Sequence, residues 1–174
     1  PYAAPGVAEL RAEFMARFAQ AGGQIDPKSK EDTAFYRWNR SVGVNEVGSE
    51  PTLVGVSVDA FHSFCETLSA AWPSTMTTLS THDTKRSEDV RARLAAMLEH
   101  AKEWEACVTE LRAATDQHRA GIDGATELLI WQTLAATWRL PGTAAGAAPI
   151  TADRLEGYLT KAMREAKAHT TWSA

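Results

Sequence analysis

Apolar residues recur at helical spacing along most of the chain, in six separate segments, and this periodicity limits the fold more than any other feature. Five of the segments begin near Pro5, Ser57, Ser87, Asp123 and Thr151, and the fourth segment carries Trp104. Helix-breaking pairs follow three of them, so we expect the first helix to stop at Gly22-Gly23, the second at Trp72-Pro73 and the fifth at Pro141-Gly142. The pattern therefore predicts a mainly α-helical chain of about six helices.

Two stretches interrupt this periodicity. Residues 24–56 mix charges, aromatic rings and glycines without a sustained period, which predicts an ordered loop with short elements. Residues 76–80 form a β-tolerant run, so we expect one or two short strands there, with ladder partners outside the chain. The stretch 142–149 is rich in Gly, Ala and Pro, and is expected to be an exposed connection. On the second helix, Phe61 and Phe64 are expected to face inward.

Composition and charge exclude several classes of protein. Lys and Arg total 18 against 22 for Asp and Glu, and a net charge of -4 argues against non-specific binding of nucleic acid or anionic membranes. No run approaches the roughly 20 apolar residues of a membrane span. The two cysteines, Cys65 and Cys107, cannot build a disulfide framework, which favours a reducing compartment. We therefore expect a cytoplasmic protein without nucleic-acid or membrane partners.

The densest polar cluster covers residues 80–86, where the expected strand meets the third helix. Residues that follow strands line the active-site face of α/β barrels. A pair such as His82-Asp83 at that place would hydrogen-bond sugar hydroxyls, and its carboxylate would stabilise a positively charged transition state. The alternative interpretation is a capped helix start that carries a solvated pair, Lys85 and Arg86.

Residues 28–40 form a second cluster, in which charged and aromatic side chains alternate. Such mixing is typical of a carbohydrate subsite, although a solvated loop anchored by buried rings is equally consistent with it. Single-stranded nucleic acid also suits basic and aromatic residues, but the nearby acidic residues oppose that interpretation. His62 and Cys65 lack a second ligand pair, and no Gly-rich phosphate loop is present, so we expect neither a metal nor a cofactor.

Four blocks of the sequence resemble the maltooligosyltrehalose synthases, which belong to the α-amylase superfamily (glycoside hydrolase family 13). The blocks are residues 28–37, 45–48, 80–94 and 164–172. They follow one another in the family's order and span about residues 25–172. The combined match is therefore specific, even though each block is short.

The resemblance implies a parent (β/α)8 barrel with an Asp nucleophile, a Glu acid/base and a second Asp that stabilises the transition state. In the family this second Asp belongs to a His-Asp pair after the seventh strand. The resemblance gives that catalytic role to Asp83, a hydroxyl contact to His82, and the seventh strand to residues 76–80. It places Lys85 and Arg86 on the side of the site that binds the acceptor sugar.

Other residues match the loop after the sixth strand, which shapes the terminal-sugar subsites in this family. They are Lys28, Glu31, Asp32 and Tyr36. The chain departs from the family's pattern at Ser29, where a glycine is usual.

The resemblance also divides the chain into regions. It implies a substrate-loop region (24–56), the seventh strand with flanking helices (57–100) and a helical insertion with late-barrel helices (101–174). Because the nucleophile and the acid/base would precede Pro1, we expect residues 1–174 to be a single fragment of a larger catalytic domain, inactive alone.

The function implied for the intact parent is isomerisation of the reducing-end α-1,4 linkage of a maltooligosaccharide to an α,α-1,1 linkage. This is the reaction of a (1→4)-α-D-glucan 1-α-D-glucosylmutase in trehalose biosynthesis, an intramolecular transglycosylation that needs no cofactor. The family also implies maltooligosyltrehalose trehalohydrolase as a functional partner. The alternative is a stand-alone helical interaction module without catalysis, in which the helices pack as a bundle.

Overall fold

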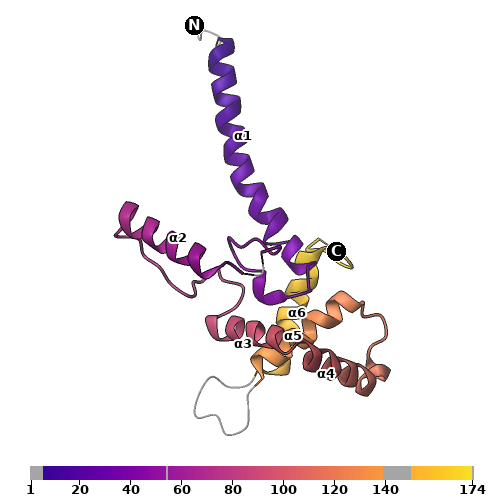
Figure 1. Ribbon diagram of the computed structural model, residues 1–174. Helices are drawn as coiled ribbons and strands as arrows, with labels where there is room; N and C mark the ends of the chain where they lie inside the picture. The colour runs from indigo at the N-terminus through magenta and orange to yellow at the C-terminus, as the bar shows by residue number, and fades with distance from the viewer. Residues whose placement is uncertain (1–5, 54, 139–149, 174) are drawn as a thin grey trace. The chain divides into compact units, whose positions relative to one another are not determined.

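The computed structural model describes residues 6–53, 55–138 and 150–173 (Figure 1). Its helices are α1 (Val7–Lys30), α2 (Val58–Ala71), α3 (Glu88–Glu99), α4 (Ala101–Ala114), α5 (Gly124–Thr137) and α6 (Ala152–Ala166). Three short 3₁₀ turns accompany them: η1 (Ala34–Tyr36), η2 (Val42–Val44) and η3 (Asp116–His118). The mainly α-helical chain predicted from the apolar periodicity is confirmed. The connection expected at 142–149 lies outside the described residues.

The chain forms two compact units. Unit 1 comprises Pro1–Arg37 and Thr160–Ala174, and unit 2 comprises Trp38–Leu159. The boundaries fall after η1 and within α6. Within the described ranges, no helix combines the length and the apolar character needed to cross a membrane.

The first helix is longer than the sequence pattern predicts. It continues through Gly22-Gly23 and includes Pro27 in its last turns. An interior glycine costs a helix only about 1 kcal/mol relative to alanine, so two of them weaken the helix without ending it. The expected loop at 24–56 therefore begins as helix, and Lys28 lies in the last turn of α1.

The strand expected at residues 76–80 does not form, and the described part of the chain contains no strand. Met76 and Leu79 are 96% and 70% exposed, so this stretch has no packing partner among the described residues. Two expected inward-facing residues of α2, Phe61 and Phe64, are likewise exposed. Strand pairing and core packing both need a partner surface, which local spacing does not supply.

The core of unit 2 lies where α3, α4 and α5 come together (Figure 1). Leu94 of α3 and Leu129 and Ala136 of α5 are buried there. The η2 turn packs on α3 and buries Val42 almost completely. This group of elements provides the fixed base for the polar segment that precedes α3.

The close approach of η2 to α3 leads to a stability prediction. A Cβ added at Gly43 would lie 3.0 Å from the Leu94 Cβ, which is tighter than ordinary contact. We expect Gly43→Ala to lower the free energy of unfolding by about 1 kcal/mol in urea denaturation, because the buried Leu94 must shift to admit the methyl group. Gly55→Ala is the matched control, since open space surrounds that position. Equal unfolding midpoints for the two variants would contradict the prediction.

Candidate substrate-binding site

Two threonines close the turn that carries the predicted catalytic pair. The Thr84 hydroxyl donates to the Thr81 carbonyl oxygen at 2.8 Å, and the Thr84 N–H donates to the same oxygen at 3.3 Å. The Thr81 hydroxyl accepts the Asp83 N–H at 3.2 Å. Side-chain bonds of this kind replace the backbone ladder that a strand would have given, so the turn is ordered locally.

The His82 and Asp83 side chains project from this turn into solvent. They are 90% and 69% exposed, and the His82 Nε2 lies 3.3 Å from the Asp83 Oδ2. The imidazole and the carboxylate therefore lie side by side, both accessible to a ligand. A neutral imidazole donates and accepts hydrogen bonds, and a carboxylate accepts them and carries negative charge. This pair suits hydroxyl binding and stabilisation of a cation.

Hydrogen bonds between Ser80 and Glu88 connect the start of the polar cluster 80–86 to the first turn of α3. The Ser80 hydroxyl donates to the Glu88 carboxylate, and the Glu88 N–H donates to the Ser80 hydroxyl oxygen at 3.1 Å. The Ser80 hydrogen bond is the main reason that the pKa of Glu88 is lowered; the Glu88 backbone N–H and Arg91 add to it. Arg91 also donates to the Leu79 carbonyl oxygen. The first N–H of α3 is thus bonded by the Ser80 hydroxyl, whereas the N-cap residue Ser87 makes no side-chain cap hydrogen bond.

This contact leads to a prediction about pH. Glu88 has a lowered pKa in the folded state, so its contribution to stability is complete above its ordinary pKa and disappears as pH falls through the lowered value. We expect Ser80→Ala to raise the pKa of Glu88 toward its ordinary value, as followed by ¹³C NMR of the Glu88 carboxyl carbon. Ser87→Ala is the control, because the Ser87 side chain makes no cap hydrogen bond. An unchanged Glu88 titration in Ser80→Ala would contradict this origin of the shift.

Glu46 connects the loop before α2 to the main chain after the His82-Asp83 pair. Its Oε1 accepts the Lys85 N–H at 2.6 Å, and its Oε2 accepts the Arg86 N–H at 3.1 Å. The Arg91 Nη1 lies 3.6 Å from Oε2, and the Glu46 side chain is only 12% exposed. Sequence reasoning did not find this role, because a bond from a side chain to a distant main chain leaves no local spacing signal.

The side chains predicted to lie toward the acceptor side are partly restrained. The Arg86 Nη2 donates to the Tyr158 hydroxyl of α6 at 2.8 Å. Lys85 and Arg86 are both half-buried, in contrast to the exposed His82-Asp83 pair. Their positions are therefore set by unit 2, in which all of these residues lie.

The remaining predicted residues belong to unit 1. Lys28 and Asp32 pair with each other, since Nζ lies 2.5 Å from Oδ2 across one helical turn. Glu31 caps α1, with its N–H donating to the Pro27 carbonyl oxygen, and Tyr36 is buried in η1. The predicted residues thus fall into two groups, one in each unit.

The Arg37 side chain connects the end of η1 to the last turn of α6. Its Nε donates to the Ala166 carbonyl oxygen at 2.5 Å, and its Nη2 donates to that of Lys167 at 3.2 Å. The Lys167 Nζ in turn donates to the Thr33 hydroxyl at 3.0 Å. A cation on the last carbonyl groups of a helix is favourable both as a cap and toward the helix dipole. Sequence reasoning did not find this contact, although Arg37 lies within the matched block 28–37.

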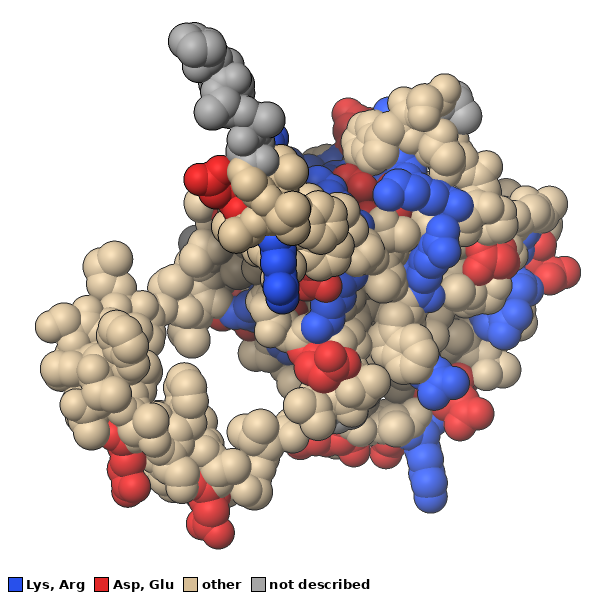
Figure 2. Space-filling model, turned by 90° about the horizontal axis from the view of Figure 1, so that it is seen from above, with Lys and Arg blue, Asp and Glu red and all other residues tan. Residues whose placement is uncertain are grey.

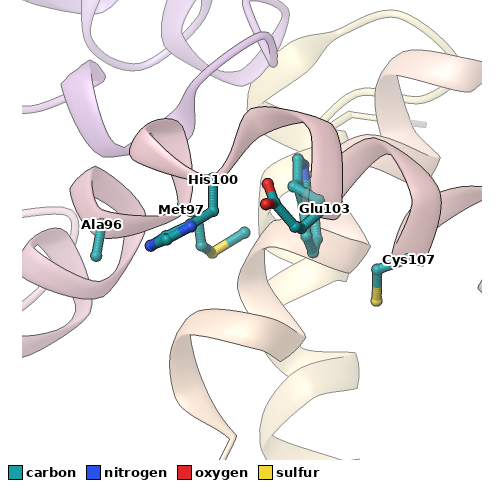
Figure 3. A pocket seen from close by; sticks show the side chains of 6 residues that line it. Ala96, Met97, His100, Glu103 and Cys107 are labelled. Carbon is teal, nitrogen blue, oxygen red and sulfur yellow. The ribbon is translucent and has the colours of Figure 1, made fainter.

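An apolar concavity of about 330 Å³ lies elsewhere in unit 2, at the corner between α3 and α4 (Figure 3). Its lining residues are Ala96, Met97, His100, Glu103, Trp104 and Cys107. From Ser87 to His100, α3 extends about 20 Å at 1.5 Å per residue, so the concavity lies at the far end of that helix from the His82-Asp83 pair. In the described ranges, no group of three metal-ligating side chains comes together there or elsewhere.

Acidic and basic side chains mix across the face drawn in Figure 2, without a continuous basic surface. The nearly balanced composition has the same character.

The fold and the site define a mainly α-helical segment in which a closed turn presents an exposed His-Asp pair. In sequence and structure, this segment is similar to part of the maltooligosyl trehalose synthases. A Mycobacterium tuberculosis protein that carries this name is 38% identical over 178 residues, which cover 99% of the chain and 22% of the relative. The resemblance predicted from the sequence is confirmed.

Solved structures agree with this similarity. The maltooligosyltrehalose synthase of Arthrobacter ramosus matches 90% of the chain at 40% identity with a TM-score of 0.74. A hypothetical maltooligosyl trehalose synthase of Sulfolobus tokodaii matches 84% at 35% identity with a TM-score of 0.71. The match covers 19% of each of these structures, so the chain spans about a fifth of the length of its relatives. No family model matches the chain.

Proposed function

We propose that the chain is the part of a maltooligosyltrehalose-forming enzyme that supplies the transition-state stabiliser. The observation that carries this proposal is the closed turn that presents the His82-Asp83 pair, in a chain similar over almost its whole length to synthases of this name. The intact protein would be a (β/α)8 barrel that converts the reducing-end α-1,4 linkage of a maltooligosaccharide to an α,α-1,1 linkage.

The proposed roles follow from the chemistry of the side chains. The Asp83 carboxylate stabilises the positive charge that develops on the sugar ring, and His82 binds a hydroxyl of the same sugar. Glycosidases that retain configuration also need a nucleophile and an acid/base about 5–5.5 Å apart. The rest of the intact protein would supply both of these carboxyl groups.

Four further residues are proposed to shape the terminal-sugar subsites. They are Lys28, Glu31, Asp32 and Tyr36, all in unit 1. Tyr36 is buried and Asp32 is paired, so these side chains would act chiefly by fixing the shape of the segment.

Isomerisation requires that water stay out while the released glucose turns, because water attack would give hydrolysis instead. Lys85 and Arg86 are proposed to hold that glucose, since both residues follow the catalytic pair. Glu46 binds the main-chain N–H of Lys85, and the Tyr158 hydroxyl binds the Arg86 side chain. The substrate is a neutral sugar, so the modest net charge of the chain is compatible with this role.

A segment exchange tests the proposed function. The matched segment of the Arthrobacter ramosus synthase is replaced by this chain, and the product is incubated with maltopentaose. Isomerisation removes reducing ends without releasing glucose, whereas hydrolysis increases the number of reducing ends. We expect reducing ends to fall, and the isolated 174-residue chain to be inactive. A folded exchange enzyme that leaves the reducing ends unchanged or increases them would reject the proposal.

The role of Lys85 leads to a separate prediction. In the exchange enzyme, Lys85→Ala is expected to raise the ratio of released glucose to trehalose-ended product about tenfold, because one contact to the trapped glucose is lost. Both products are quantified by chromatography. Lys102→Ala, an exposed lysine on α4, is the control. An unchanged product ratio would show that Lys85 does not hold the glucose.

The alternative, a helical interaction module, requires its helices to pack as a bundle. Figure 1 shows α2 apart from the group formed by α3, α4 and α5, with Phe61 and Phe64 exposed. The described residues therefore do not form the bundle that this alternative expects. The apolar side chains of α2 instead favour burial against a further surface, which the intact enzyme would provide.

A further inference from the structure

The Glu46 carboxylate binds main-chain N–H groups that lie 39 and 40 residues further along the sequence. Oε1 accepts the Lys85 N–H at 2.6 Å, and Oε2 accepts the Arg86 N–H at 3.1 Å. Oε1 also accepts the N–H of the next residue, Val47, at 2.9 Å. The Arg91 guanidinium, 3.6 Å away, adds an opposite charge. Hydrogen bonds to an ionised acceptor are roughly twice as strong as neutral ones, and burial strengthens them further. The carboxylate is therefore a firm link between the two segments.

The segment that carries Glu46 is itself fixed to α5. The buried Gln132 side chain accepts the Val42 N–H at 2.9 Å and donates to the Asn39 carbonyl oxygen at 2.8 Å. The Asn45 Nδ2 donates to the Trp38 carbonyl oxygen at 2.5 Å. These contacts replace main-chain pairing in a loop, so Glu46 extends from a rigid part of unit 2.

The anchored amides lie only two and three residues after Asp83, and the Thr81–Thr84 turn is closed by its own side chains. A movement of Lys85 would therefore carry the whole turn with it. We infer that Glu46 is a positioning residue, which fixes the His82-Asp83 pair through the Lys85 and Arg86 amides. This inference rests on the proposed function of that pair, while the anchoring itself does not. Glu46 acts through the main chain and does not touch the substrate.

Kinetics of the exchange enzyme test this role. In Glu46→Gln, an amide group would face an N–H donor in place of one carboxylate oxygen, so the turn would lose an anchor. We expect kcat to fall about 10- to 100-fold with a smaller change in KM, because misplacement affects the transition state more than binding. Glu46→Asp restores two charged acceptor oxygens and is expected to recover part of kcat. Glu50→Gln, on the same loop, removes the same charge and is expected to leave kcat unchanged.

Amide hydrogen exchange of the 174-residue chain gives a readout independent of activity. We expect exchange of the Lys85 and Arg86 amides to accelerate about tenfold or more in Glu46→Gln, while the Leu94 amide in the middle of α3 stays protected. Unchanged amides would overturn the anchoring. Faster amide exchange with unchanged kcat would overturn the positioning role. An inactive exchange enzyme with protected amides would reject the proposed function but not the anchoring. Should Glu46→Gln unfold, as judged by its melting transition, Glu46→Asp must keep both amides protected; their loss would overturn the inference.

Discussion

Asp83→Asn in the exchange enzyme is expected to lower kcat/KM for maltopentaose about 10³-fold. Asparagine keeps the shape of the side chain but removes the negative charge that would face the developing positive charge, and electrostatic contributions of this kind are worth about 10²–10³ in rate. The Asp83 side chain is 69% exposed, and its neighbour is the His82 imidazole at 3.3 Å. Because it supports no core contact, the melting temperature is expected to stay unchanged while the rate of trehalose-end formation falls.

Asp89→Asn is the matched control for this prediction. Asp89 is an exposed carboxylate in the first turn of α3, six residues after Asp83, and its loss removes the same charge. Its rate is expected to match that of the unsubstituted exchange enzyme. If Asp83→Asn retained the unsubstituted rate, the stabiliser would have to be another group, and the role given to the pair would be wrong.

The helices were predictable because their signals are local. Ser57 caps α2 by accepting the Ala60 N–H, and Asp123 caps α5 by accepting the Ala125 and Thr126 N–H groups. Both residue types are preferred at such positions, and each lies immediately before an apolar periodic run. The beginnings of α2 and α5 therefore agree with the sequence to within a residue.

The sequence-based predictions of the fold are wrong at two kinds of place. In one, the outcome depends on the summed helix propensities of many residues; in the other, it depends on whether a strand finds a pairing partner. Gly22-Gly23 did not end α1, because the surrounding residues outweigh two penalties of about 1 kcal/mol each. Residues 76–80 have a composition suited to a strand but no strand to pair with among the described residues. Local composition predicts which conformations are permitted, while pairing decides which of them forms.

Of the candidate site, sequence reasoning predicts only the part that neighbouring residues carry. His82 and Asp83 are adjacent in sequence, and the structure presents both on one turn. The residues that fix their surroundings were not predictable. Glu46 and Arg37 act on main-chain groups about 40 and 130 residues away, so neither the residue type nor the spacing marks the contact.

The largest stability effect is expected at Glu127, which joins α4, η3 and α5. Its side chain is only 6% exposed, with the Arg119 Nε at 2.8 Å and the Arg112 Nε at 3.2 Å. The Trp131 Nε1 also donates to it at 3.4 Å. Breaking a buried ion pair typically costs about 3–5 kcal/mol, and without Glu127 the half-buried Arg119 keeps only its pair with the exposed Asp116.

We expect Glu127→Ala to lower the free energy of unfolding of the chain by about 3 kcal/mol in urea denaturation, near the lower end of that range. The value is at the lower end because Arg112 is half exposed and can turn toward water, and Arg119 keeps Asp116 as a partner at 3.2 Å. Glu110→Ala, at an exposed position on α4, removes the same charge and is expected to change stability by less than about 0.5 kcal/mol. A loss in Glu127→Ala as small as that of the control would mean that helix packing alone holds α4 to α5. In Arg119→Ala, the cost is expected to be comparable, because the buried Glu127 carboxylate then loses its closest cation.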